Sequence, residues 1–457
     1  MRTKVFFISM FIFFILFSNC LPPGPESNNN DNNTTATTVS SITINGVIVD
    51  TFTNMPISQA INVTFSGPDK ALAEKSSKAV NGILKLDKGQ ITFDIQKDDI
   101  ATLDFTIVVA TDLYITSSKR INSVTKGGKY DFQIGLVNIE KTPGGVSVVQ
   151  KAIGTVDSSG KIATEVSLST KTDEKTTSKA TITLKEGTII KDASGNALTG
   201  EIKATVGYFS PKSVDALSCF PGGLGNVSVT TSRGVEDDGF FVSGGFVSID
   251  ITDSNGRSAE KFEGNSLKVN LDIPEGLLNP ETNAPVKQGD VIPLWSYNKD
   301  TGKWTKEESV TRSSNGVEKE NGKLSLSFEA PHLSYWNVDW HSPGKLDLSR
   351  KIILQGVQNG KFVMLKLYSN EYGFETTVYV VYDGFIIIKN VPSFPLNIIV
   401  YDEGYKEIGK KDGVKLGDTG DLEITTALFN FDITKLAGEW LYKTLTMRFE
   451  MTFNIAN

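Results

Sequence analysis

Hydrophobic and polar residues alternate along most of this chain. Runs such as 42–49, 103–109 and 180–184 place every second side chain on one face, as in a strand with one buried side. Turn sequences containing Gly or Asn separate such runs, and no long segment keeps helical periodicity. The pattern predicts an all-β fold of short strands at the spacing typical of sandwiches. Further strands are expected at 267–271 and 324–328, and turns at 157–160, 192–196, 253–256, 298–302 and 320–322.

The first residues form a different pattern. Arg2 and Lys4 precede the apolar run 5–17, which ends just before Cys20. A membrane-spanning helix needs about 20 apolar residues, so this shorter run is typical of a cleaved export signal. The residues before Cys20 are similar to the box that precedes the lipidated cysteine of bacterial lipoproteins. We therefore expect a signal peptide at 1–19 and lipid attachment at Cys20.

Residues 20–41 are expected to form a disordered linker behind the lipid. They are rich in Pro, Asn, Thr and Ser and almost lack large apolar side chains, so they cannot bury enough surface to offset the entropy of ordering. The first expected partner is therefore the membrane, contacted through the N-terminal lipid. The predicted location is the cell envelope, with the lipid in the outer membrane and the protein on its surface or its periplasmic face.

The segment 42–140 is predicted to be the first sandwich. Gly46 and Asp50 belong to a strand that leads through a polar turn to Pro56 and the next strand. This order resembles the carboxypeptidase regulatory-like, or prealbumin-like, β-sandwich. The resemblance implies an accessory domain in which these residues direct folding and do not catalyse a reaction.

The segment 144–340 is predicted to be a paired β-sandwich region. It contains four separated motifs, at 180–200, 208–223, 291–304 and 331–337. In this order they resemble the ectodomain of cartilage intermediate layer protein and its bacterial lipoprotein relatives, which is akin to the paired sandwiches of ankyrins and netrin receptors. The resemblance implies a fold found in matrix, scaffold and surface proteins, and it implies no particular activity.

The strand pattern returns in the segment 345–430. An Asp383-Gly384 hairpin, a strand, Pro392 and the strand 396–400 follow one another, as at the end of an immunoglobulin-like sandwich. We expect a third sandwich here, followed by a C-terminal tail at 431–457. The predicted architecture is a tandem of immunoglobulin-like and prealbumin-like β-sandwich domains.

Composition limits the chemistry that this chain can perform. It has two histidines and two cysteines, too few for a multi-histidine metal site or a disulfide framework. The net charge of −7, without a basic cluster, argues against nucleic acid as a partner. The motif at 253–256 lacks an earlier ligand of a calcium loop and is interpreted as a turn. We expect no catalytic residues, no cofactor and no metal, and a buried, inert thiol at Cys219.

One motif suggests a specific reaction. His332, Leu333 and Ser334 are similar to the His-Phe-Ser motif at which some eukaryotic members of the paired-sandwich superfamily cleave their own backbone. There the serine attacks the preceding carbonyl with help from the histidine. The resemblance implies either a cleavage site between Leu333 and Ser334 or a closing strand with no chemistry.

Three functions remain open at this point. The leading hypothesis is a non-enzymatic, membrane-anchored lipoprotein that presents β-sandwich modules for adhesion or protein interaction. The second is a carbohydrate-binding accessory lipoprotein that contacts a polysaccharide through exposed aromatic residues, with Trp295 and Trp304 as the ligand-binding residues. The third is a surface protein that cleaves itself at Leu333-Ser334. Aromatic residues in strands also serve as core, so Trp295 and Trp304 have a structural alternative.

Overall fold

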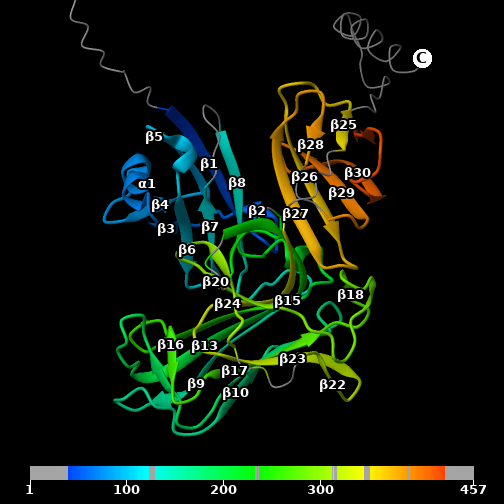
Figure 1. Cartoon of the computed structure of the whole chain (residues 1–457). Helices are drawn as coiled ribbons and strands as arrows, with labels where there is room; N and C mark the ends of the chain where they lie inside the picture. Colours follow the sequence, from blue (N-terminus) through cyan, green and yellow to red (C-terminus); the bar gives the residue numbers. More distant parts are fainter. Residues whose placement is uncertain are drawn as a thin grey trace, which may run out of the picture. The chain divides into compact units, whose positions relative to one another are not determined.

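The computed structural model describes residues 40–427, apart from 123–128, 226, 232–233, 235, 311, 313–315, 344–349 and 389–391, and these residues belong to one compact unit. The predicted signal peptide, Cys20, most of the linker and the tail from 431 lie outside the described residues. Within the described part, no helix is long and apolar enough to cross a membrane. The prediction of an all-β fold of tandem sandwiches is confirmed (Figure 1).

The first sandwich consists of two four-stranded sheets around a core of aliphatic and phenylalanine side chains. One sheet contains β2 (Met55–Pro56), β1 (Ser40–Asp50), β5 (Gln90–Lys97) and β8 (Lys129–Leu136); the other contains β4 (Ile83–Leu86), β3 (Ile61–Ser66), β6 (Phe105–Thr111) and β7 (Tyr114–Ile121). A helix, α1 (Lys70–Ser77), and a 3-10 turn, η1 (Ile100–Thr102), join strands of this sandwich.

The residues that carry the prealbumin-like resemblance have folding roles here. Gly46 pairs with Phe132 of β8, and a Cβ at position 46 would lie 2.1 Å from the Phe132 ring, so only glycine fits. Asp50 accepts hydrogen bonds from the backbone N–H groups of Phe52 and Thr53, which closes the turn after β1. Its other oxygen accepts the hydroxyl of Tyr114 at 2.9 Å, which connects that turn to the opposite sheet.

The second sandwich packs a seven-stranded sheet against a five-stranded one. The larger sheet contains, in order, β14 (Val227–Thr230), β21 (Lys303–Lys306), β20 (Leu294–Asn298), β24 (Tyr335–Pro343), β15 (Glu236–Asp253), β13 (Gly200–Phe209) and β9 (Val146–Val156); the smaller contains β10 (Val166–Ser169), β11 (Ala180–Leu184), β17 (Leu267–Ile273), β23 (Lys323–Ala330) and β22 (Glu318–Glu320). Short pairs and one helix complete it: β12 (Ile189–Lys191) with β16 (Lys261–Glu263), β18 (Leu278–Asn279) with β19 (Ala284–Pro285), and α2 (Val214–Leu217).

The central strands of the seven-stranded sheet are buried on both faces. Tyr208 packs in the core shared with the five-stranded sheet, whereas the adjacent Phe209 lies in a second, aromatic core on the opposite face. Within β15 the pairing with β24 shifts between Ser243 and Phe246, so the Gly244-Gly245 pair forms a bulge, as glycine pairs inside strands often do.

The third sandwich has a three-stranded and a four-stranded sheet. The three-stranded sheet contains β28 (Ile386–Ile387), β25 (Lys351–Gln355) and β31 (Leu422–Thr425). The four-stranded sheet contains β27 (Phe374–Val381), β26 (Phe362–Ser369), β29 (Leu396–Asp402) and β30 (Glu407–Val414). Its core is continuous with that of the second sandwich, because Phe374 meets Phe240 edge to face at 5.9 Å. The second and third sandwiches therefore share buried side chains.

The local turn predictions are confirmed. Gly160, Gly195, Gly256 and Gly302 all have positive φ, the left-handed conformation that favours glycine. Helix α1 was not predicted. Its sequence combines Ala, Leu, Glu and Lys, which are strong helix formers, but it has only 8 residues and buries only Ala73 completely, so it lacks the long apolar stripe that identifies a helix in a sequence.

Candidate functional site

Trp295 and Trp304 lie in the aromatic core, which corrects their proposed role as exposed ligand-binding residues. Trp304 is 1% exposed and stacks on Phe220 at 4.8 Å, and its indole N–H donates to the carbonyl of Pro221. Trp295 meets Phe241 edge to face at 5.0 Å and donates to the carbonyl of Asp339. Neither indole forms an exposed platform of the kind that a polysaccharide would stack on.

The aromatic core also attaches the first sandwich to the second. Ile115 and Val137, from the first sandwich, belong to the same buried cluster as Phe209 and Trp304. The hydroxyl of Tyr335 donates to the carbonyl of Thr116 at 2.7 Å. Buried contacts therefore fix the first sandwich to the second, and the two do not behave as independent domains.

His332 and Ser334 are engaged with different partners. His332 lies 3.5 Å from Glu307 and stacks on the Trp336 ring at 5.0 Å. Burial favours a higher pKa for Glu307, but hydrogen bonds from His332 and Ser296 outweigh burial and hold that pKa below its ordinary value. The hydroxyl of Ser334 donates to the carbonyl of Tyr297. No hydrogen bond joins His332 to Ser334 in the described part of the chain.

We expect the chain to stay intact between Leu333 and Ser334. A serine hydroxyl that donates to the Tyr297 carbonyl is not activated by His332, and activation by a neighbouring base is what makes serine a nucleophile. Intact mass spectrometry of the purified protein at neutral pH should give one species that spans this bond. Two fragments that meet between Leu333 and Ser334 would establish self-cleavage instead.

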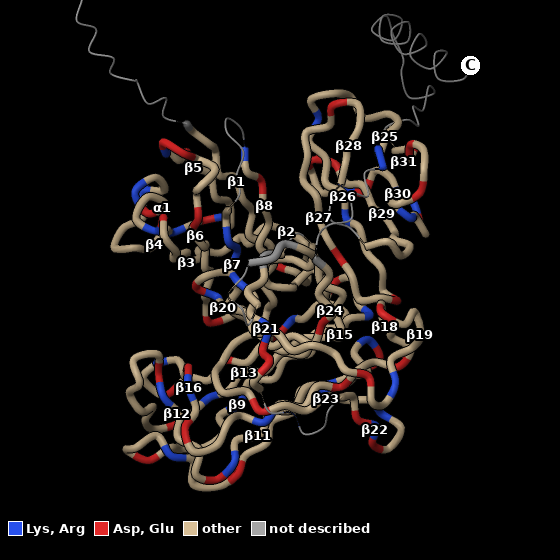
Figure 2. The backbone as a smooth tube through the Cα atoms, in the orientation of Figure 1, with Lys and Arg blue, Asp and Glu red and all other residues tan. Residues whose placement is uncertain are grey.

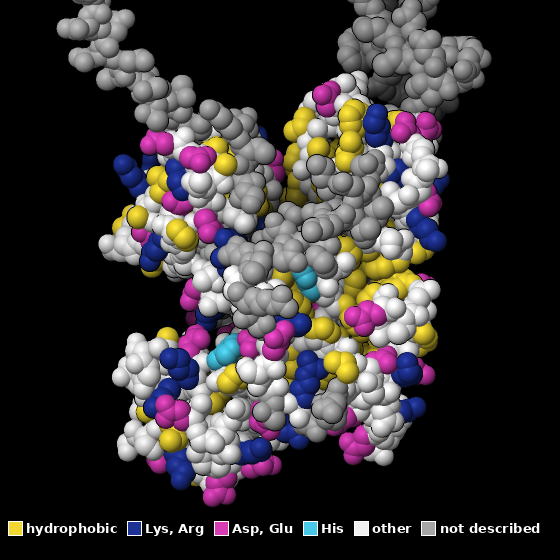
Figure 3. All heavy atoms as spheres, in the orientation of Figure 1, with side chains coloured by type: hydrophobic (Ala, Val, Ile, Leu, Met, Phe, Trp, Pro, Cys, Tyr) yellow, Lys and Arg dark blue, Asp and Glu magenta, His cyan; other side chains and the backbone are white. Residues whose placement is uncertain are grey.

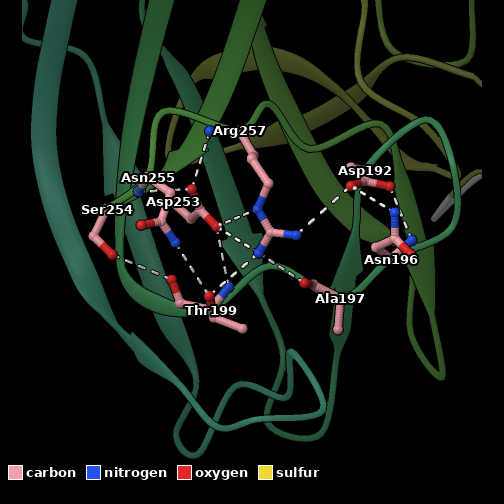
Figure 4. A network of polar contacts seen from close by, with 8 residues as sticks. All are labelled: Asp192, Asn196, Ala197, Thr199, Asp253, Ser254, Asn255 and Arg257. Atoms are coloured by element: carbon pink, nitrogen blue, oxygen red, sulfur yellow. Dashed lines mark hydrogen bonds and ion pairs between the residues drawn. The ribbon is translucent and has the colours of Figure 1, made fainter.

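The turn at 253–256 forms an ion pair with the guanidinium of Arg257 through Asp253. Figure 4 shows Arg257 pointing between Asp253 and Asp192, which belong to two neighbouring turns. Its Nη2 lies 2.7 Å from Asp253 Oδ2 and donates to the carbonyl of Ala197. Burial alone would raise the pKa of Asp253, but the hydrogen bonds from Arg257 outweigh it and lower that pKa. This arrangement matches the interpretation of 253–256 as a structural turn.

The compact unit contains a cavity with a volume of about 780 Å³. Side chains of all three sandwiches line it. The first contributes Thr51, Thr53–Met55, Ser117–Arg120, Asn122 and Tyr130–Gly135. The second contributes Ser218–Phe220, Gly222, Gly223, Gly225, Val227, Gly302 and Trp304. The third contributes Met364, Lys366, Glu375–Tyr379, Ile388, Tyr401, Gly404 and Tyr405. Its size falls in the range of small-molecule sites, which is about 300–1,000 Å³.

Strand alternation gives β8 two different faces beside the cavity. Phe132 and Ile134 enter the core of the first sandwich, so the side chains of Asp131 and Gln133 leave by the other face, and the whole segment Tyr130–Gly135 borders the cavity. The Tyr379 hydroxyl, from β27 of the third sandwich, lies 3.2 Å from Gln133 Oε1 and bridges the two walls. These outward positions have the sequence pattern of solvent-facing strand residues, so the sequence did not identify them.

Close backbone approaches bring the walls together. A Cβ at position 225 would lie 2.3 Å from the Thr376 hydroxyl, and one at position 135 would lie 2.8 Å from the Thr51 methyl group. Gly225 and Gly135 therefore allow the third sandwich and the Thr51 turn to pack closely beside the cavity. Glycines that accommodate a neighbouring element in this way are the sequence signal that could have pointed to the site.

Most of the charges around the cavity are already engaged. Arg120 forms a two-pronged ion pair with Asp104, with both distances at 2.7 Å. Lys366 donates to the Ser218 hydroxyl at 3.0 Å and acts electrostatically on Glu375. Burial nevertheless raises the pKa of Glu375 above its ordinary value. Along the rest of the described backbone, Lys and Arg are interspersed with Asp and Glu (Figure 2).

Lys119 differs from these charges. Its side chain lines the cavity, and its Nζ donates to the carbonyl of Gly222 at 2.9 Å. Within the described ranges no carboxylate lies at ion-pair distance from it. Burial without an opposing charge lowers the pKa of Lys119 below its ordinary value. The cavity therefore has a cation whose charge no carboxylate of the described residues compensates.

Cys219 also borders the cavity, and it is buried and free, as expected from the sequence. Its Sγ donates to the Asp215 carbonyl, and burial raises the pKa of Cys219 to about 12. A thiol that stays protonated at neutral pH is a poor nucleophile. Among the described residues, no three His, Cys, Asp or Glu side chains gather as metal ligands.

Comparisons with known proteins identify no family, because no family model matches the chain. Solved structures with distant similarity include a variant of the major pilin subunit BcpA of Bacillus cereus, 9% identical over 85% of this chain and 99% of that one, with a TM-score of 0.15. The major pilin SpaA of Corynebacterium diphtheriae is 7% identical over 85% of this chain and 100% of that one, with a TM-score of 0.13. Because these TM-scores are so low, the fold assignment rests on the sheets described above.

Proposed function

We propose that this chain is a non-enzymatic, lipid-anchored protein of the cell envelope that acts by binding a ligand in the cavity between its three sandwiches. The export pattern and Cys20 support the anchor. The few catalytic residue types, and the separate engagements of His332 and Ser334, support a binding role over a chemical one. Adhesion or protein interaction at the envelope would then depend on what this cavity captures.

The cavity is the observation that carries this proposal. A ligand inside it would contact three sandwiches at once, and its 780 Å³ is room for a molecule of several sugar or amino acid residues. On the face shown in Figure 3, hydrophobic side chains are mixed with charged and polar ones. We place the ligand in the cavity because residues of three sandwiches converge there.

In the carbohydrate hypothesis, tyrosines of the cavity replace the buried tryptophans as the residues that contact the sugar. Tyr130, Tyr379, Tyr401 and Tyr405 line the cavity, and the rings come from strands or turns of two sandwiches. Burial raises the pKa of Tyr379 well above its ordinary value, so its hydroxyl stays protonated; it donates to Gln133 and can accept a hydrogen bond from a ligand. Aromatic faces beside hydrogen-bonding groups suit a sugar, which presents apolar C–H faces and hydroxyl edges.

A glycan array with the full lipidated chain in detergent tests this function. The wild type should bind a defined set of glycans, and Thr377→Trp should weaken that binding at least about tenfold, because Thr377 is on the cavity wall and the indole fills the space. Thr64→Trp is the matched control, since Thr64 is exposed on β3 of the first sandwich. Absence of glycan binding by the folded wild type, or equal binding by Thr377→Trp, would refute the proposal.

A further inference from the structure

We infer that the ligand of the cavity is an acidic saccharide whose carboxylate pairs with the Lys119 ammonium. This inference rests on the proposed function and specifies its ligand. It starts from the position of Lys119 in the cavity wall, where its one hydrogen bond is to the uncharged carbonyl of Gly222. An ammonium has three donors, so Lys119 has donors left for a ligand.

The other charged side chains around the cavity already interact with protein groups, so Lys119 is the best placed to bind a ligand carboxylate. Arg120 is held by Asp104, and Lys366 donates to Ser218 and acts electrostatically on Glu375. Asp131, the half-buried carboxylate of the wall, accepts a hydrogen bond from the Asn45 amide at 2.6 Å. Arg120 therefore has an ion pair and Lys366 interacts electrostatically with Glu375, whereas no described carboxylate does either for Lys119.

A carboxylate from the ligand would compensate the free-energy cost of holding the Lys119 ammonium in the cavity wall without a counter-charge. A partly buried ammonium without a counter-charge is destabilised relative to water, and an anion at hydrogen-bond distance reverses this. The same anion would raise the pKa of Lys119 back toward its ordinary value, since an opposite charge favours the charged form. Binding of an acidic ligand should therefore be stronger at neutral pH than above the pKa of Lys119.

The other wall groups favour a saccharide over a lipid tail. The lining includes the hydroxyls of Ser117 and Thr377 and the amides of Asn122 and Gln133. Thr377 and Gln133 each have one partner in the protein, and a hydrocarbon chain would remove the remaining donors and acceptors of these groups from water without replacing the lost hydrogen bonds. Sugar hydroxyls both donate and accept, so they can satisfy hydroxyls and amides together.

Calorimetric titration of the full lipidated chain in detergent tests the inference. The ligands are trimers of galacturonic, glucuronic and mannuronic acid, their neutral methyl esters, and triglutamate as an acidic peptide. At least one acidic trimer should bind at least about tenfold more tightly than its ester, and Lys119→Met should remove that preference at pH 7. Lys119→Arg should keep part of it, and Lys151→Met, at an exposed lysine of the second sandwich, should change nothing.

The outcomes separate this inference from the proposed function. If the acid and its ester bind equally, or if Lys119→Met keeps full affinity for the acid, Lys119 does not anchor the ligand. If Thr377→Trp still blocks binding in that case, the cavity remains the binding site. Triglutamate binding as tightly as the acidic trimers overturns the saccharide class. Failure of every acidic trimer to bind overturns the inference. Thermal melting is the folding control, and Lys119→Met should melt no lower than wild type because it removes an uncompensated charge.

Discussion

Trp304→Ala should lower the free energy of unfolding by about 3–5 kcal/mol, the range measured when a buried aromatic side chain is truncated. The Trp304 indole is almost fully buried, stacks on Phe220, meets Phe241 edge to face at 5.7 Å and donates to Pro221. Its removal leaves a cavity in the aromatic core and an unpaired carbonyl. Guanidinium denaturation followed by circular dichroism measures the loss.

Phe385→Ala is the matched control for this experiment. Phe385 is 46% exposed, and its contact is with the ammonium of Lys351 at 4.9 Å from the ring centre. Its truncation should cost less than about 1 kcal/mol, because exposed cation–π pairs contribute little. If Trp304→Ala lost glycan binding while keeping wild-type stability, Trp304 would be a ligand platform and not part of the core.

Cys20→Ser should release the protein from the membrane almost completely. Each buried methylene of an acyl chain contributes about 0.8 kcal/mol, so loss of the lipid removes nearly all membrane affinity from a chain that has no long apolar helix among its described residues. Metabolic labelling with palmitate and membrane fractionation measure the change. The variant should be unlabelled and found in the soluble fraction.

Cys219→Ser controls for the other cysteine. Cys219 is buried, with its thiol donating to the Asp215 carbonyl, so it should accept no lipid and its substitution should leave labelling unchanged. A wild-type chain that carries no label and fractionates with soluble proteins would rule out the lipid anchor. Labelling that persists in Cys20→Ser would place the lipid on another residue.

Local structure could be predicted from the sequence because its causes are local. The alternation at 180–184 gives β11 with the predicted bounds, since a two-residue period has only one way to bury its apolar face. The turn at Gly302 follows from the same logic, because a positive φ favours glycine and the Asn298 side chain accepts from the following backbone. These signals need no knowledge of the rest of the chain.

The cavity could not be predicted because it is a property of packing. Gln133 and Tyr379 are 246 positions apart and meet only after two sandwiches pack together. In the sequence, each is an ordinary outward residue of an alternating strand. Trp295 was assigned a surface role for a related reason: it lies on the second face of a sheet, and that face is buried by the chain between Ala216 and Val229 of the same sandwich, together with Ile115 and Val137 of the first.

Hydroxyl-radical footprinting of the full chain, with and without a bound acidic trimer, is the most direct test that the cavity is the binding site. Met55 and Tyr405 line the cavity from two different sandwiches and have side chains that radicals oxidise readily. The bound trimer should protect both, while oxidation of the exposed Phe385 should stay the same. Unchanged oxidation of Met55 and Tyr405 at saturating ligand, with protection elsewhere, would show that the ligand binds outside the cavity.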